Sequence, residues 1–186
     1  MSTVTRHEQL LADLGATFRP QRQWVEGRGV LLIVGHFLSG VGAGTWLFSL
    51  WLGYWPGLVL AVQVMALAGV AHLFFLGHPE RFWRMFRART SWIARGFIGM
   101  NLFMVGGVLT LVLRAGALRS AAAAVAVVGA AIIIVYKGNV YAASKGVPFW
   151  NSPLLPVLYA TYAIRGGLAL LTPGSGNATV LYPERV

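Results

Sequence analysis

The chain has 186 residues, of which 57% are hydrophobic and 11% are charged, and its formal net charge is +10. This composition is typical of an integral membrane protein and excludes an ordinary soluble domain of this size. No cysteine is present, which excludes a disulfide, a thiolate metal site and an iron–sulfur cluster held by this chain. The basic residues flank apolar runs, so we expect lipid headgroups or a partner protein, and not nucleic acid, to meet them.

The chain opens with a polar N-terminal tail of mixed charge at residues 1–29. Five continuous apolar runs follow, at residues 30–54, 56–76, 92–113, 118–141 and 154–171. A bilayer core about 30 Å thick needs about 20 apolar residues in a helix. Continuous runs also disagree with the alternating strands of a membrane barrel. We therefore predict an all-α integral membrane bundle of about five transmembrane helices, followed by a C-terminal tail at residues 172–186.

Charge predicts how this bundle sits in the membrane. Eleven basic residues lie on the side of the N-terminus, counting Lys137, and three lie on the other side. The positive-inside rule then places the N-terminus in the cytoplasm. All five acidic residues lie outside the runs, which argues against an ion-coupled transporter or a proton pump, and Arg165 stands inside the fifth run without an acidic neighbour.

Three polar side chains of the predicted helices share one membrane face. His36 lies early in the first run, His72 near the end of the second, and Tyr136 near the end of the fourth. Antiparallel helices bring these positions to the same depth. Three uses remain open: the two histidines ligate a haem iron, His36 and Tyr136 bind the oxygens of a quinone, or these groups only hydrogen-bond the backbone of the bundle.

Small residues mark the first run. Gly40 and Gly44 have the spacing of a helix-packing motif, because small side chains let two helices approach closely. Tight packing is one interpretation, and close approach of a flat ligand at Gly40 is the other.

The segment between the second and third runs reads LGHPERFWRMFRARTSW, residues 76–92. Its basic and aromatic side chains have two interpretations, a topology signal or a docking surface, and arginine suits docking because its planar fork pairs with carboxylates. The residues concerned are Arg81, Arg84, Arg87, Arg89 and Trp83.

Three motifs in this order resemble one family. They are HFLSGVGAGTWL at residues 36–47, the LGHPERFWRMFRARTSW segment, and YKGNVYAASKGVPFWNSPLLPVLY at residues 136–159. Together they are similar to the NrfD-type membrane subunits of polysulfide reductase and its relatives, which include the membrane anchor of dimethyl sulfoxide reductase. The resemblance covers about residues 30–171.

The resemblance implies a function in anaerobic respiration. Such subunits sit in the bacterial or archaeal cytoplasmic membrane and bind menaquinone or ubiquinone without haem. They anchor a ferredoxin-like iron–sulfur subunit and a molybdopterin catalytic subunit, which hold the redox centres. By motif position His36 and Tyr136 match the quinone pocket of the family. His72 is a second candidate for proton transfer, and Gly40 is a candidate contact. Trp150 and Asn151 join the docking residues, although Asn151 has a second interpretation as the cap of the fifth helix.

The chain also departs from the family pattern. Family members commonly have eight or more helices, so a second membrane subunit is a further candidate partner. His78 stands where the family has arginine, and Gly96 stands where the dimethyl sulfoxide reductase anchors carry a glutamate. Two alternatives therefore remain beside the quinone subunit: a structural anchor without a working quinone site, and a small b-type cytochrome with His36 and His72 as haem ligands.

Overall fold

The computed structural model describes residues 8, 26–87, 91–142, 150 and 152–172. From residue 26 onward, every regular element of this described part is a helix. The helices are α3 Gly29–Trp51, α4 Trp55–Phe75, η1 Pro79–Arg87, α5 Trp92–Val112, α6 Ala117–Ala142 and α7 Leu155–Leu171, where η1 is a 3₁₀ helix. Most of the predicted N-terminal tail and almost all of the predicted C-terminal tail lie outside the described residues.

Four of these helices, α3 to α6, are long and apolar enough to cross a bilayer. The chain is thus a multi-pass membrane protein built from helices, as its apolar runs predict. The fifth predicted crossing corresponds to α7, which has 17 residues. A helix of that length spans about 25 Å at 1.5 Å per residue, somewhat less than a hydrocarbon core of about 30 Å. A full crossing by α7 therefore stays a prediction.

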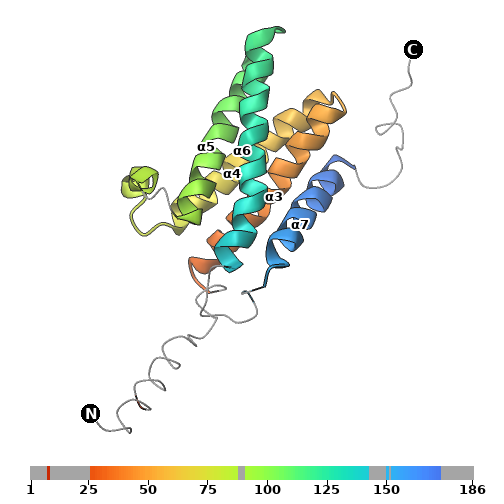
Figure 1. Cartoon of the computed structure of the whole chain (residues 1–186). Coiled ribbons are helices and arrows are strands. Elements are labelled where there is room, and N and C mark those ends of the chain that lie inside the picture. Colours follow the sequence, from red (N-terminus) through yellow and green to blue (C-terminus); the bar gives the residue numbers. More distant parts are fainter. Residues whose placement is uncertain (1–7, 9–25, 88–90, 143–149, 151, 173–186) are drawn as a thin grey trace.

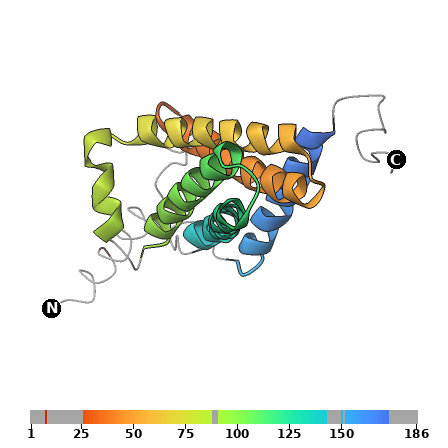
Figure 2. The ribbon, with the colours of Figure 1, turned by 90° about the horizontal axis from the view of Figure 1, so that it is seen from above.

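The helices form a bundle of two hairpins and one added helix (Figure 1). α3 packs against α4, α5 packs against α6, and α7 covers α3 and α6. Seen from above, η1 and α7 lie on opposite sides of the bundle (Figure 2). Large side chains fill the interior between the hairpins, among them Trp46, Met65, Phe103 and Ile133, each with no exposed surface.

Short connections force the hairpins to be antiparallel. Gly53 adopts a φ of 65° between α3 and α4, a left-handed conformation that glycine accepts without strain. Pro56 lies in the first turn of α4, where its missing N–H removes no helical hydrogen bond. As a result, the start of α3, the end of α4, the start of α5 and the end of α6 meet at one end of the bundle, which we call the N-terminal face.

Small residues decide how α7 joins the bundle. A Cβ built on Gly44 would overlap the carbonyl oxygen of Ala163, and one built on Gly167 would overlap the backbone of Gly44. α3 and α7 are thus in backbone contact. Gly40, one turn earlier on α3, also faces α7, with Ala163 Cβ 3.6 Å from a built Cβ. Tight helix packing is therefore what Gly40 and Gly44 do in this structure.

Candidate functional site

A cavity of about 530 Å³ opens at the N-terminal face, between α3, α4, α5, α6 and η1. Ligand pockets typically measure about 300–1,000 Å³ and combine an apolar wall with a few polar groups. Methionine and phenylalanine side chains form much of this wall: Met65, Phe75, Phe82, Met85, Phe97, Met100 and Met104. The polar side chains in the lining are His36, His72, Asn101, Tyr136 and Tyr141. The cavity thus has the composition of a site for a largely apolar ligand with a polar head.

His36 stands at the centre of the polar group. Its Nδ1 lies 2.6 Å from the hydroxyl of Tyr141 on α6. Its ring meets His72 edge to face, with ring centroids 5.1 Å apart, and Tyr136 in the same manner at 5.9 Å. Residues from α3, α4 and α6 therefore form one cluster.

His72 presents an acceptor that has no partner among the described residues. Its Nδ1 lies 2.7 Å from the carbonyl oxygen of Ala68, one turn earlier on α4. A carbonyl only accepts, so Nδ1 carries the hydrogen, and Nε2 is left as an acceptor. Nε2 is buried, and no described residue hydrogen-bonds with it. Such a buried polar atom costs about 1–3 kcal/mol when it is left unsatisfied, which makes it a place for a donor on a ligand.

Gly96 on α5 makes room for Tyr136. A Cβ built on Gly96 would overlap the ring of Tyr136, whose exposed fraction is 4%. The space that a side chain at position 96 would need is therefore filled by the aromatic ring of a neighbouring helix.

Lys137 lies inside the bundle, not at its surface. Its side chain is 2% exposed, and its Nζ donates a hydrogen bond to the carbonyl oxygen of His36 at 2.5 Å. A Cβ built on Gly40 would come within 2.9 Å of this Nζ. Lys137 is therefore not counted among the basic residues of the N-terminal face. Ten basic residues then remain there against three on the other side, so the predicted orientation keeps its basis.

The structure brings three of the four predicted quinone-site residues together. His36, His72 and Tyr136 all line the cavity, whereas Gly40 faces α7 and Lys137 and is not in the lining. Sequence reasoning missed Tyr141, which lies in the third quoted motif five residues after Tyr136. Five residues turn an α-helix by about 500°, so the two tyrosines point about 140° apart, and their spacing gave no signal that Tyr141 also lines the cavity.

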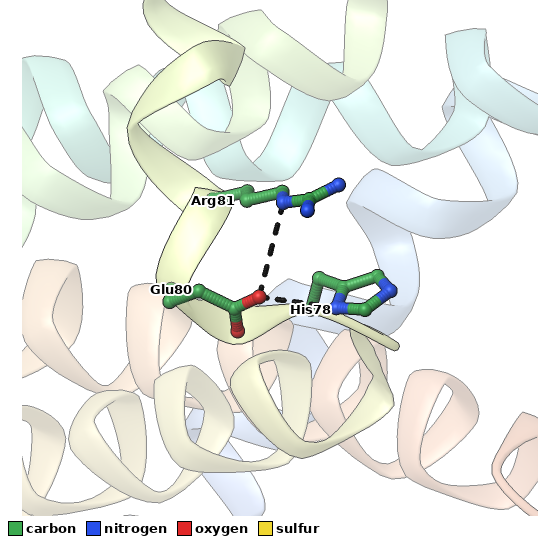
Figure 3. A network of polar contacts seen from close by, with 3 residues as sticks. All are labelled: His78, Glu80 and Arg81. Carbon is green, nitrogen blue, oxygen red and sulfur yellow. Dashed lines mark hydrogen bonds and ion pairs between the residues drawn. The ribbon is translucent and has the colours of Figure 1, made fainter.

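The predicted docking residues that the structure describes have two kinds of neighbour, an acidic side chain or an aromatic ring. Glu80 Oε1 lies 3.0 Å from His78 Nδ1 and 3.8 Å from Arg81 Nε, so Arg81 has an acidic neighbour within the chain (Figure 3). Arg84 and Arg87 instead lie over the ring of Trp83, at 5.8 and 5.5 Å from its centroid.

The arginines and Trp83 sit on the 3₁₀ helix η1, in a segment between two apolar runs where no helix was expected. η1 is short, and its arginines leave it without an apolar run of helical length. Trp150 contacts the ring of Tyr141, with centroids 4.9 Å apart. Arg89 and Asn151 lie outside the described residues.

Comparison with protein-family models and with curated proteins finds no match. The resemblance to NrfD-type subunits therefore rests on the three motifs alone.

Proposed function

We propose that this chain is the membrane anchor and quinone-binding subunit of an NrfD-type respiratory oxidoreductase complex. The cavity at the N-terminal face carries the proposal, because an apolar wall and an unpaired buried acceptor occur together there. The three sequence motifs supply the family. The chain would pass electrons between the quinone pool and an iron–sulfur partner while holding no redox centre of its own.

The residues present fit a quinone. Its flat apolar ring suits walls of methionine and phenylalanine, which adapt to such surfaces. Its two oxygens suit the neighbouring His36, Tyr136 and Tyr141, which donate and accept hydrogen bonds. Menaquinone or ubiquinone, when bound, would supply reversible reduction of the quinone to the quinol by two electrons and two protons.

The side chains of this chain would then bind, orient and move protons. His72 Nε2 would accept a hydrogen bond from a hydroxyl of the ligand, because its Nδ1 is committed to Ala68. His36 would face the same head group, oriented by its contact with Tyr141. The apolar wall would keep water away from the exchange and strengthen these hydrogen bonds.

The histidine geometry argues against haem. Two axial imidazoles must point at one iron from opposite faces of a macrocycle. Here the rings of His36 and His72 are in direct edge-to-face contact, with centroids 5.1 Å apart. A macrocycle would have to separate them, which favours the quinone alternative over the cytochrome.

The partners follow from charge and position. Arg84 and Arg87 on η1 project from the N-terminal face and suit acidic groups of a ferredoxin-like iron–sulfur subunit. A molybdopterin catalytic subunit would join through that subunit. The exposed outer side of α7, which includes Arg165, offers a place for a second membrane subunit. We place the chain in the cytoplasmic membrane with its N-terminus in the cytoplasm.

The test is a substitution in the cavity wall that fills the cavity with a larger side chain. Gly69 lines the cavity, and a Cβ built there meets only Met100 Sδ at 3.7 Å, so Gly69→Leu sends its side chain into the open space. We expect purified wild-type chain in nanodiscs to bind a fluorescent hydroxyquinoline N-oxide, a quinol analogue, and Gly69→Leu to weaken that binding at least about tenfold. That loss corresponds to about 1.4 kcal/mol.

Ala131→Leu is the matched control, because Ala131 is exposed on the outer side of α6. Its binding should equal that of the wild type. Absence of analogue binding by the wild type would leave the chain a structural anchor and defeat the proposal. Equal binding by Gly69→Leu and Ala131→Leu would remove the cavity as the site.

A further inference from the structure

A line of hydrogen-bonding side chains leads away from the cavity. It begins at His36, whose Nδ1 lies 2.6 Å from the Tyr141 hydroxyl. Tyr141 continues to Tyr159 on α7: the two rings are stacked, with centroids 5.2 Å apart and 12° between their planes, which brings the two tyrosines side by side. Three side chains from three helices thus connect the cavity with α7.

Exposure increases from Tyr141 to Tyr159. Tyr141 is 7% exposed, and the ring of Trp150 packs against it. Tyr159 is only half-buried and is the fifth residue of α7, close to the N-terminal face. The line therefore runs from the interior of the bundle to its boundary on that face.

Of the polar groups in and beside the cavity, His72, Asn101 and Lys137 offer no such path among the described residues. His72 Nδ1 donates to the carbonyl of Ala68, which cannot pass a proton on. Asn101 Nδ2 donates to the carbonyl of Phe97 in the same way. Lys137 contacts the backbone carbonyl of His36, not its ring. This geometry favours His36 over His72 as the first group of a path that leads away from the cavity.

We propose that His36, Tyr141 and Tyr159 form a proton relay between the cavity and the N-terminal face. The proposal rests on the proposed function, since it assigns the path taken by the protons of a quinol. Each of the three groups both donates and accepts hydrogen bonds, which a relay requires.

The transfer balances without a buried charge. His36 Nε2 takes a proton from a hydroxyl of the ligand while Nδ1 gives its proton to the Tyr141 oxygen. Tyr141 gives its hydroxyl proton to Tyr159, and Tyr159 gives its own to water at the surface. Each group forms one bond to hydrogen as it loses another and stays neutral, which avoids the cost of an isolated charge in an apolar site. The electrons pass to the iron–sulfur partner.

This line of side chains can be tested in the ligand-free protein. We would record ¹⁵N spectra of the full chain labelled at its four histidines. Tyr141→Phe should shift the Nδ1 resonance of His36, because it removes the 2.6 Å partner. Tyr159→Phe should shift it less, since hydrogen bonds in a chain polarise one another. Unchanged His36 resonances in both variants would overturn the relay.

The second measurement uses the assembled complex and separates the relay from the site. Tyr159→Phe keeps the stacked ring and removes only the hydroxyl. We expect it to bind the hydroxyquinoline N-oxide as the wild type does, while quinol-dependent turnover falls about tenfold to a hundredfold. A complete general acid–base group typically contributes ~10²–10⁴-fold to a rate. The loss that we expect is at or below this range, because water can replace part of the path.

Tyr162→Phe on the same helix is the control. Tyr162 is 44% exposed and its ring contacts Phe37, so its hydroxyl lies off the line, and turnover should not change. Wild-type turnover in Tyr159→Phe with normal analogue binding would overturn the relay and leave the quinone site standing. Failure of the wild type to bind the analogue would defeat the site and the relay together.

Discussion

At the scale of single residues, Gly96 and Tyr136 depend on one another. The ring of Tyr136 occupies the space that a side chain at position 96 would need. A glutamate at this position, as in the dimethyl sulfoxide reductase anchors that the sequence resembles, would require the ring to move. The local chemistry of this cavity therefore rests on aromatic and imidazole groups, and the described acidic residues lie outside its lining.

Gly96→Ala tests this dependence. The added methyl group would overlap the ring of Tyr136, and such overpacking typically costs about 1–3 kcal/mol. Gly69→Ala is the control, because it brings the same gain in helix propensity without an overlap. A Cβ built on Gly69 meets only Met100 Sδ, at an ordinary contact distance of 3.7 Å. We expect thermal unfolding in detergent to show Gly96→Ala less stable than Gly69→Ala. Equal stability would show that Tyr136 moves aside without cost.

At the scale of elements, α7 is held by small residues. Gly44 on α3 and Gly167 on α7 bring the two backbones together, and Ala163 completes the contact. Without a hydrophobic driving force between helices in lipid, close packing of this kind supplies much of the association. The contact also positions Tyr159 beside Tyr141, so the path that we propose depends on it.

Gly167→Leu should separate α7 from α3. The leucine would be driven into the backbone of Gly44, with a cost of about 1–3 kcal/mol or more. Ala169→Leu, at an exposed position of the same helix, is the control. Titration with sodium dodecyl sulfate should show Gly167→Leu losing helix packing at a lower detergent fraction. A common midpoint for the two variants would contradict the backbone contact.

At the scale of the whole molecule, the candidate ligand site and the candidate docking surface lie at the same end of the bundle, the N-terminal face. The cavity, η1, Trp150 and the start of α7 all lie there. Arg84 and Arg87 border the cavity wall through η1, which contributes Phe82 and Met85 to the lining. A partner docked on η1 would therefore sit next to the quinone head that we propose.

Reversal of charge on η1 tests the docking surface. The double variant Arg84→Glu, Arg87→Glu should release the soluble subunits from membranes washed at moderate salt, because like charges would then face the acidic partner. Arg114→Glu, exposed at the opposite end of the bundle, should leave them bound. The readout is the fraction of iron–sulfur subunit that sediments with the membrane. Full retention by the double variant would assign these arginines to topology alone.

The sequence by itself determined the helices and their order. Uninterrupted apolar runs must become helices in lipid, because no water is present to satisfy the backbone. Each of the five α-helices described between residues 29 and 171 lies within three residues of its predicted bounds. The shared depth of His36, His72 and Tyr136 followed from the antiparallel order of their helices.

Only the tertiary structure decided which way each helix faces. The spans are apolar on nearly all sides, so their pattern does not distinguish the inner face from the lipid-facing one. For this reason the sequence left Gly40 between helix packing and ligand contact, and the structure places it against α7. Lys137 was counted with the charges on the side of the N-terminus, and it lies inside the bundle. The pairing of His36 with Tyr141, and of Tyr141 with Tyr159, depends on these rotations, because residues far apart in the sequence meet only when the helices pack.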